Sequence, residues 1–178
     1  MKPVLIKKES NDEKEIIETI KEYIKKETGD EIEIYKIFNH HKHNGGIGYH
    51  IDKGNHKGFQ SMPWCIYSAS WIEDTDYMNG SFLFKNPEMI VTREEQLNHI
   101  LIFDCFTPHS VEPVKNGDRL SNVYFFGSKD KAPTKPVRVG PNEYHQHNTD
   151  VVVPLDELIK LEKEGKLPYV LPRAIPFE

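Results

Sequence analysis

The 178-residue sequence lacks several features that mark whole classes of protein. It has only two cysteines, Cys65 and Cys105, and both lie in apolar, strand-like runs, so we expect buried free thiols and no disulfide framework. No apolar stretch has the length needed to span a bilayer, and the N-terminus lacks the charged-then-apolar pattern of a signal peptide. These absences predict a cytoplasmic protein in a reducing compartment, with no membrane partner.

An excess of positive charge is also lacking. The chain has 23 basic and 28 acidic residues, for a formal charge of −5, and no long basic run interrupts its middle. Because binding to nucleic-acid phosphates usually requires a basic surface, we expect no nucleic-acid partner. The length suits a single domain that must recognise any ligand by itself.

Hydrophobic periodicity predicts one helix followed by a series of short strands. The helix covers residues 11–28, with a capping box formed by Ser10 and Glu13 and an end at Gly29. Turn residues then separate expected strands at residues 31–39, 46–52, 63–73, 80–85, 99–105, 109–114 and 119–127. This series predicts a mainly β fold with flanking helices, built on a double-stranded β-helix, or jelly-roll, core.

The expected elements divide a single domain of residues 1–178 into three parts. An N-terminal helical segment covers residues 1–30, the jelly-roll core covers 31–127, and a C-terminal extension with a short helix over 154–164 covers 128–178. Two roles for the extension remain open at this point. It could close over the core, or it could pack on a second subunit and form a homodimer.

Three potential metal ligands stand out in the expected core: His50 and Asp52, two residues apart, and the distant His109. Alternate residues of a strand point to the same side, so His50 and Asp52 can reach one metal ion. Two imidazoles and one carboxylate are the facial ligand set of non-haem Fe(II) oxygenases. The competing interpretation is that the three are ordinary polar residues near a sheet edge.

Arg119 and Ser121 follow His109 closely and could bind an anion. The arginine offers a planar donor fork that suits a carboxylate, and the serine adds a hydroxyl group. The alternative for Arg119 is a surface ion pair with Asp118 or Glu112.

The segments that begin at His109 and Arg119 are predicted to form a hairpin. A two-residue Asn-Gly loop would place Arg119 and Ser121 on the face opposite His109. A three-residue loop, closed by Gly117 in a left-handed conformation, would place all three side chains on one face. We favour the second geometry and predict a positive φ at Gly117.

Together these residues resemble the 2-oxoglutarate and Fe(II)-dependent dioxygenases, and within them the small prolyl 4-hydroxylase-like branch. The resemblance covers about residues 30–127 and includes the His-x-Asp pair, the distal histidine and the arginine ten residues later. The string Asn79-Gly80-Ser81-Phe82-Leu83-Phe84 is similar to the Gly-Gly-Glu-Leu-x-Phe strand of that branch. Its usual Tyr-Leu-Asn is replaced here by Tyr67-Ser68-Ala69-Ser70-Trp71, which leaves the substrate class open.

The resemblance implies a role for each candidate residue. His50, Asp52 and His109 would form the catalytic Fe(II) centre, and Arg119 would bind the distal carboxylate of the co-substrate 2-oxoglutarate with help from Ser121. Tyr49 and Tyr67, on neighbouring strands, could each reach the co-substrate; the alternative is that they pack in the core with their hydroxyl groups at its rim. With O2, such a site decarboxylates 2-oxoglutarate to succinate and hydroxylates an unactivated C–H bond, with ascorbate as a supporting reductant.

A prolyl or other aminoacyl residue of a peptide or protein is the expected substrate. One alternative is a free amino acid or small metabolite, and a different class is a cupin-like metal-binding protein without oxidative turnover. Asp52 favours hydroxylation over halogenation, because in this family a small residue there would leave a position open for halide. The glycine-containing loop at residues 53–62 is interpreted either as a lid over the substrate or as a simple connection.

Overall fold

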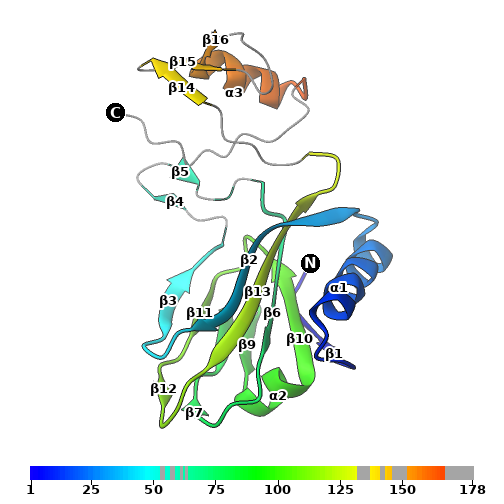
Figure 1. Ribbon diagram of the computed structural model, residues 1–178, viewed down its shortest axis with the longest axis vertical. Coiled ribbons are helices and arrows are strands. Elements are labelled where there is room, and N and C mark those ends of the chain that lie inside the picture. The colour runs from blue at the N-terminus through cyan, green and yellow to red at the C-terminus, as the bar shows by residue number, and fades with distance from the viewer. Residues whose placement is uncertain are drawn as a thin grey trace.

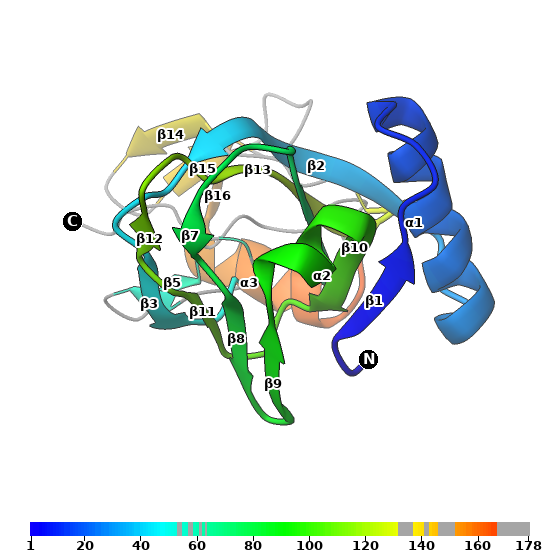
Figure 2. The same ribbon diagram turned by 90° about the horizontal axis from the view of Figure 1, so that it is seen from below.

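The computed structural model describes residues 1–52, 55–56, 59–60, 62, 64–131, 137–140, 143–145 and 152–166. Two antiparallel sheets face each other in a jelly-roll core, which confirms the predicted fold class (Figures 1 and 2). The major sheet has the order β1 (Val4–Lys7), β10 (His99–Asp104), β6 (Tyr67–Ile72), β13 (Leu120–Ser128) and β2 (Ile32–Lys42). The minor sheet has the order β3 (Ile47–His50), β11 (His109–Val111), β8 (Phe82–Lys85) and β9 (Glu88–Val91).

The remaining described elements are short. The strands β7 (Met78–Asn79) and β12 (Val114–Lys115) pair with each other, as do β4 (Asn55–His56) and β5 (Phe59–Gln60). In the C-terminal extension, a three-stranded sheet precedes a helix close to the expected position; these elements are β14 (Val137–Gly140), β15 (Glu143–His145), β16 (Val152–Pro154) and α3 (Leu155–Lys163). Half of the residues of the 53–62 loop lie outside the described residues, and with them the prediction of a lid.

Helix α1 (Glu13–Thr28) covers the outer face of the major sheet (Figure 2). Its apolar stripe, Ile16, Ile20 and Ile24, is fully buried against large side chains of the sheet, among them Tyr67, Trp71, Tyr124 and Phe126. The predicted capping box at Ser10 is wrong, because the side chain of Asp12 accepts the hydrogen bond from the Glu15 amide at 3.1 Å and Asp12 is the N-cap. The helix ends at Gly29 as predicted, in the left-handed conformation.

The predicted hairpin between the segments of His109 and Arg119 is also wrong. Strand β11 belongs to the minor sheet, between β3 and β8, whereas β13 belongs to the major sheet, between β6 and β2. The chain therefore crosses from one sheet to the other between the two segments. The positive φ predicted at Gly117 is confirmed at +142°, and any side chain there would collide with the carbonyl oxygen of Asp76.

Several described elements have no counterpart in the sequence-based expectations, among them β1, β9 and the short helix α2 (Arg93–Asn98). Helix α2 begins with a capping box in which Thr92 accepts from the Glu95 amide and Glu95 accepts from the Thr92 amide. It connects β9 to β10, and thus one sheet to the other.

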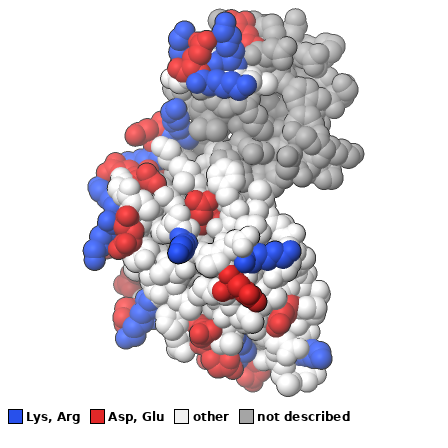
Figure 3. Space-filling model, turned by 180° about the vertical axis from the view of Figure 1, so that it is seen from behind, with Lys and Arg blue, Asp and Glu red and all other residues white. Residues whose placement is uncertain are grey.

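The distribution of charged side chains on the described surface indicates no particular class of partner. On the face shown in Figure 3, acidic and basic side chains of the described residues are interspersed, without a broad field of one sign. Among the helices of the described ranges, none has the length and apolar character needed to cross a membrane. The absence of a nucleic-acid partner stays a prediction.

Candidate functional site

A cavity of about 180 Å³ lies between the two sheets. The minor sheet and the turn after β3 contribute the predicted metal ligands to its wall, and the major sheet contributes Ser121, with Arg119 immediately before β13. Five of the seven predicted site residues therefore line one cavity: His50, Asp52, His109, Arg119 and Ser121. They meet across the space between two sheets instead of on one face of a hairpin.

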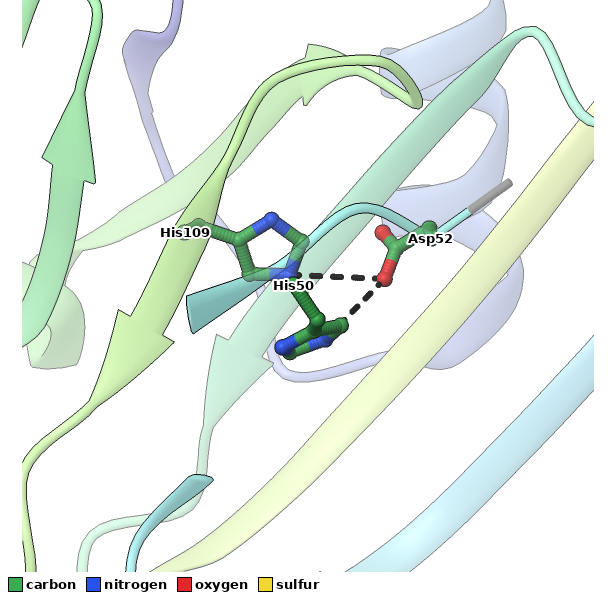
Figure 4. Close-up of side chains that lie close together, drawn as sticks. All are labelled: His50, Asp52 and His109. Atoms are coloured by element: carbon green, nitrogen blue, oxygen red, sulfur yellow. Dashed lines mark ion pairs between the residues drawn. The ribbon is translucent and has the colours of Figure 1, made fainter. Parts of the chain in front are cut away.

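His50, Asp52 and His109 point toward one another (Figure 4), and their nearest ligand atoms all lie within 4.8 Å of each other. The Asp52 Oδ1 atom is 3.5 Å from Nε2 of His50 and 3.3 Å from Nε2 of His109. The two histidines are register partners on adjacent strands, β3 and β11. Strand β3 ends at His50, so Asp52 reaches the pair from a turn and not from the extended strand that the sequence predicts.

Backbone hydrogen bonds fix which nitrogen of each histidine faces the carboxylate. Nδ1 of His50 lies 2.9 Å from the carbonyl oxygen of Gly48, and Nδ1 of His109 lies 2.8 Å from that of Thr107. A carbonyl oxygen can only accept, so each Nδ1 donates and each neutral imidazole presents the lone pair of Nε2. Two such lone pairs and a carboxylate oxygen then converge, an arrangement that a shared cation or added protons must stabilise.

The charges at this cluster are strongly coupled. Burial would raise the pKa of the Asp52 carboxyl group, but hydrogen bonds and attraction from the two histidines hold it well below its usual range. The hydrogen bond to Asp52 raises the pKa of His50, against the opposing effect of burial. Asp52 is thus an anion at neutral pH, as a metal ligand must be.

The ring of His109 is held by aromatic packing as well as by its hydrogen bond. It stacks on Phe82 with ring centroids 5.2 Å apart and lies 4.7 Å from the ring of Phe103. These contacts leave the buried imidazole one orientation, with Nε2 toward Asp52.

Arg119 is 3% exposed, and its guanidinium group lies in the wall of the cavity. The alternative of a surface ion pair is wrong, because Asp118 bonds to Asn44 and Lys42, and no carboxylate of the described residues pairs with Arg119. Burial lowers the pKa of this guanidinium, partly offset by the neighbouring Tyr77. A buried cation without a counter-ion is unfavourable unless a bound anion supplies the missing charge.

The structure does not bring the two predicted tyrosines into the cavity. Tyr49 points away from it, is 46% exposed and lies under the ammonium group of Lys85 at 4.0 Å. Tyr67 lies on the outer face of β6 in the α1 core, and its hydroxyl group donates to Asp30. Strand alternation explains both cases, because successive side chains of a strand point to opposite faces. Tyr49 therefore points away from the side of its neighbour His50, and Tyr67 points away from the side of its neighbour Ser68.

Sequence reasoning missed other residues near the site. Gln96, which is 3% exposed, accepts hydrogen bonds from Arg119. His41 and His43 line the cavity from the end of β2, with ring centroids 4.3 Å apart, beside the apolar side chains of Phe38 and Phe125. The sequence signal for Gln96 was the capping pattern from Thr92 to Glu95, which places a helix there.

Comparisons with known proteins give a limited result. No protein-family model matches the sequence, and no curated protein matches it significantly. An oxidoreductase of the 2OG-Fe(II) oxygenase family from Burkholderia pseudomallei is similar in structure, with a TM-score of 0.47 and 16% identity over 70% of this chain and 66% of that chain, just under two thirds of its length. A prolyl-4-hydroxylase from Pseudomonas putida has a TM-score of 0.43 and 12% identity, over 69% of this chain and 70% of that chain. The function proposed below rests on the side chains of the site.

Proposed function

We propose that the protein is an Fe(II)- and 2-oxoglutarate-dependent dioxygenase that hydroxylates an unactivated C–H bond. The observation that carries the proposal is the buried Arg119 cation, without a carboxylate partner among the described residues, in the same cavity as His50, Asp52 and His109. A metal-binding site alone has no use for such a cation. A 2-oxo diacid uses both features, because its 2-oxo acid end can bind the metal while its far carboxylate pairs with the arginine.

The metal ligands in this proposal are Nε2 of His50, Nε2 of His109 and a carboxylate oxygen of Asp52. The donor set fits Fe(II), because two imidazoles and one carboxylate on one side of the ion leave positions free for co-substrate and O2. When bound, Fe(II), 2-oxoglutarate and O2 supply the oxidising power that releases succinate and CO2 and hydroxylates the substrate. The protein's own contribution is to orient these ligands and to keep Asp52 ionised.

Arg119 and Ser121 would hold the far carboxylate of 2-oxoglutarate. The arginine provides charge-assisted hydrogen bonds, which are stronger in a buried site than in water. The Ser121 hydroxyl group now donates to the carbonyl oxygen of His41 at 3.3 Å, a long bond that rotation could exchange for the ligand. Both side chains are nearly inaccessible to bulk solvent, so a carboxylate bound to them would be shielded from it.

For the substrate we propose a prolyl or other aminoacyl residue of a peptide or protein. Phe38, Ile47, Val123 and Phe125 line the cavity with apolar surface, which suits an aliphatic side chain or ring. Phe38 is 38% exposed, so this apolar wall extends to the surface, where a longer chain can bind.

Anaerobic titration of the Fe(II)-loaded protein with 2-oxoglutarate tests the proposal. The expected result is a weak visible metal-to-ligand charge-transfer band that saturates with ligand. We expect Arg119→Ala to weaken this binding at least tenfold, because charge-assisted hydrogen bonds contribute about 1.5–3 kcal/mol. Lys42→Ala is the matched control, since Lys42 is an exposed cation paired with Asp118 and should leave the titration unchanged.

Failure of this titration would have a clear meaning. If the iron-loaded protein shows no band at any 2-oxoglutarate concentration, the protein is a metal-binding protein without oxidative turnover. If the band appears, turnover of prolyl peptides and of free amino acids, with ascorbate present, tests the substrate.

A further inference from the structure

The guanidinium group of Arg119 is held by a neutral side chain. Its Nε and Nη2 atoms donate to the same acceptor, Oε1 of Gln96, at 3.3 and 2.7 Å. Both residues are 3% exposed, so water does not compete for these bonds. One edge of the guanidinium is thereby fixed, and Arg119 still forms part of the cavity wall.

The amide of Gln96 can adopt only one orientation. Its Nε2 atom donates to the carbonyl oxygens of Gly80 at 3.1 Å and Val91 at 3.0 Å. Carbonyl oxygens only accept and guanidinium nitrogens only donate, so the NH2 group must face the backbone and Oε1 must face Arg119. A glutamate here would direct a carboxylate oxygen at two carbonyl oxygens, which is unfavourable. An amide can donate to these carbonyl oxygens and also accept from the guanidinium group.

The position of Gln96 is fixed by its helix. Its backbone N–H group donates to the Thr92 carbonyl oxygen at 2.9 Å, directly after the capping box that begins α2. Val91 ends β9 and Gly80 precedes β8, so the side chain of Gln96 connects the minor sheet to the arginine at the start of β13. The absence of a side chain at Gly80 gives space there, because a Cβ atom would lie 2.9 Å from the Tyr77 ring and 3.4 Å from Cδ of Arg119.

The side chain of Gln96 carries no charge, which is the second property of its arrangement with Arg119. A carboxylate at position 96 would satisfy the same two donors and would also cancel the charge of Arg119. The amide satisfies the donors without cancelling the charge, which remains available to a ligand. Burial of the guanidinium lowers its pKa; Tyr77 partly offsets this effect, and no carboxylate of the described residues does so.

We propose that Gln96 is a positioning residue that aims Arg119 at the far carboxylate of the co-substrate and leaves its charge uncompensated. The protein would then select 2-oxo diacids over 2-oxo monoacids through Gln96 as well as through Arg119. This inference rests on the proposed function. Gln96 itself acts only through the arginine.

The test compares 2-oxoglutarate with 2-oxopentanoate, which has the same chain length and lacks the far carboxylate. Affinities for the anaerobic Fe(II) protein are measured by calorimetry for the wild type, Gln96→Met and Gln96→Glu. We expect each variant to reduce the preference for the diacid about tenfold, the value of one charge-assisted hydrogen bond, with the affinity for 2-oxopentanoate unchanged. The methionine removes the acceptor, and the glutamate retains an acceptor but neutralises the charge.

Asn98→Ala is the matched control. Asn98 is an exposed residue of the same helix, and its side chain donates to the carbonyl oxygen of Glu94, so its replacement should leave the diacid preference intact. If Gln96→Met does not fold, as judged by circular dichroism, Gln96→Glu supplies the same ratio.

Three results would overturn the inference or its foundation, and they are distinguishable. An unchanged preference in a folded Gln96 variant overturns the positioning role. An equal loss of affinity for both acids reduces Gln96 to a structural residue. A wild-type protein that binds Fe(II) but does not prefer the diacid contradicts the proposed function itself.

Discussion

The two faces of the major sheet differ in what they pack against. Toward α1, strands β6 and β13 present large buried groups in continuous contact, including Trp71, Tyr124 and Phe126. Toward the minor sheet the same strands present Ser70 and Ser121 as well as the apolar Val123 and Phe125, beside the buried cation of Arg119 and a cavity. Cavities and unpaired buried charges destabilise a fold, so the outer face provides stability and the inner face retains features that suit a ligand.

The largest effect that we expect comes from breaking the outer face. Ile20→Ala removes a fully buried side chain from α1 and should lower the free energy of unfolding by about 2–5 kcal/mol. Urea unfolding measures this change, with Lys14→Ala on the exposed side of the helix as a control that should stay within about 0.5 kcal/mol. A change at Ile20 no larger than that at Lys14 would show that this face is not the main source of stability.

A smaller change in stability should follow from altering the inner face. Arg119→Met removes a buried cation, which is favourable, but leaves Oε1 of Gln96 without a donor, which costs about 1–3 kcal/mol. These effects oppose each other, so the metal- and ligand-free variant should unfold within about 1 kcal/mol of the wild type. The stabilisation by saturating 2-oxoglutarate, about 2.7 kcal/mol at a hundredfold excess over Kd in the Fe(II)-loaded wild type, should largely disappear.

Urea unfolding with and without Fe(II) and 2-oxoglutarate measures both quantities. A loss of stability in ligand-free Arg119→Met as large as that in Ile20→Ala would contradict the comparison, because the arginine would then be a structural residue. Preserved stabilisation by the ligand would instead exclude Arg119 from its binding site.

The sequence predicted the members of the site better than the way in which they meet. The sequence predicted that His50, Asp52, His109, Arg119 and Ser121 lie together, and all five line one cavity. The expected hairpin was wrong because local turn chemistry, including the correctly predicted Gly117, does not determine which sheet the following strand joins. The two segments pair with strands far away in sequence, and the residues of the segments themselves do not indicate which strands these are.

Tyr67 illustrates another reason why the arrangement of the site could not be predicted from the sequence. Alternation along β6 separates Tyr67, Ala69 and Trp71 from Ser68 and Ser70, but it does not say which set faces the other sheet. The usual rule places large apolar side chains between the sheets. Here α1 covers the apolar face, and the serines face inward, so a tyrosine expected near the co-substrate lies in the core.

The smallest expected effect concerns two histidines near the end of β2. The side chain of His40 is 70% exposed, with Nδ1 2.8 Å from a carboxylate oxygen of Glu73, and this hydrogen bond raises its pKa above the usual 6.5. His43 lines the cavity, where burial and the neighbouring His41 and Arg119 lower its pKa. Two histidines three residues apart should therefore titrate on opposite sides of the ordinary value.

The signs of their contributions to stability are opposite as well. A raised pKa means that protonated His40 stabilises the fold below pH 6.5, and that this contribution is lost as the pH rises through its folded-state pKa. A lowered pKa means that the neutral form of His43 is favoured in the fold, so acidification below pH 6.5 destabilises it. NMR titration of the metal-free protein measures both values, and Glu73→Gln should return His40 toward 6.5 without moving His43. Equal pKa values in the wild type would remove the electrostatic distinction between the exposed side chain and the one that faces the cavity.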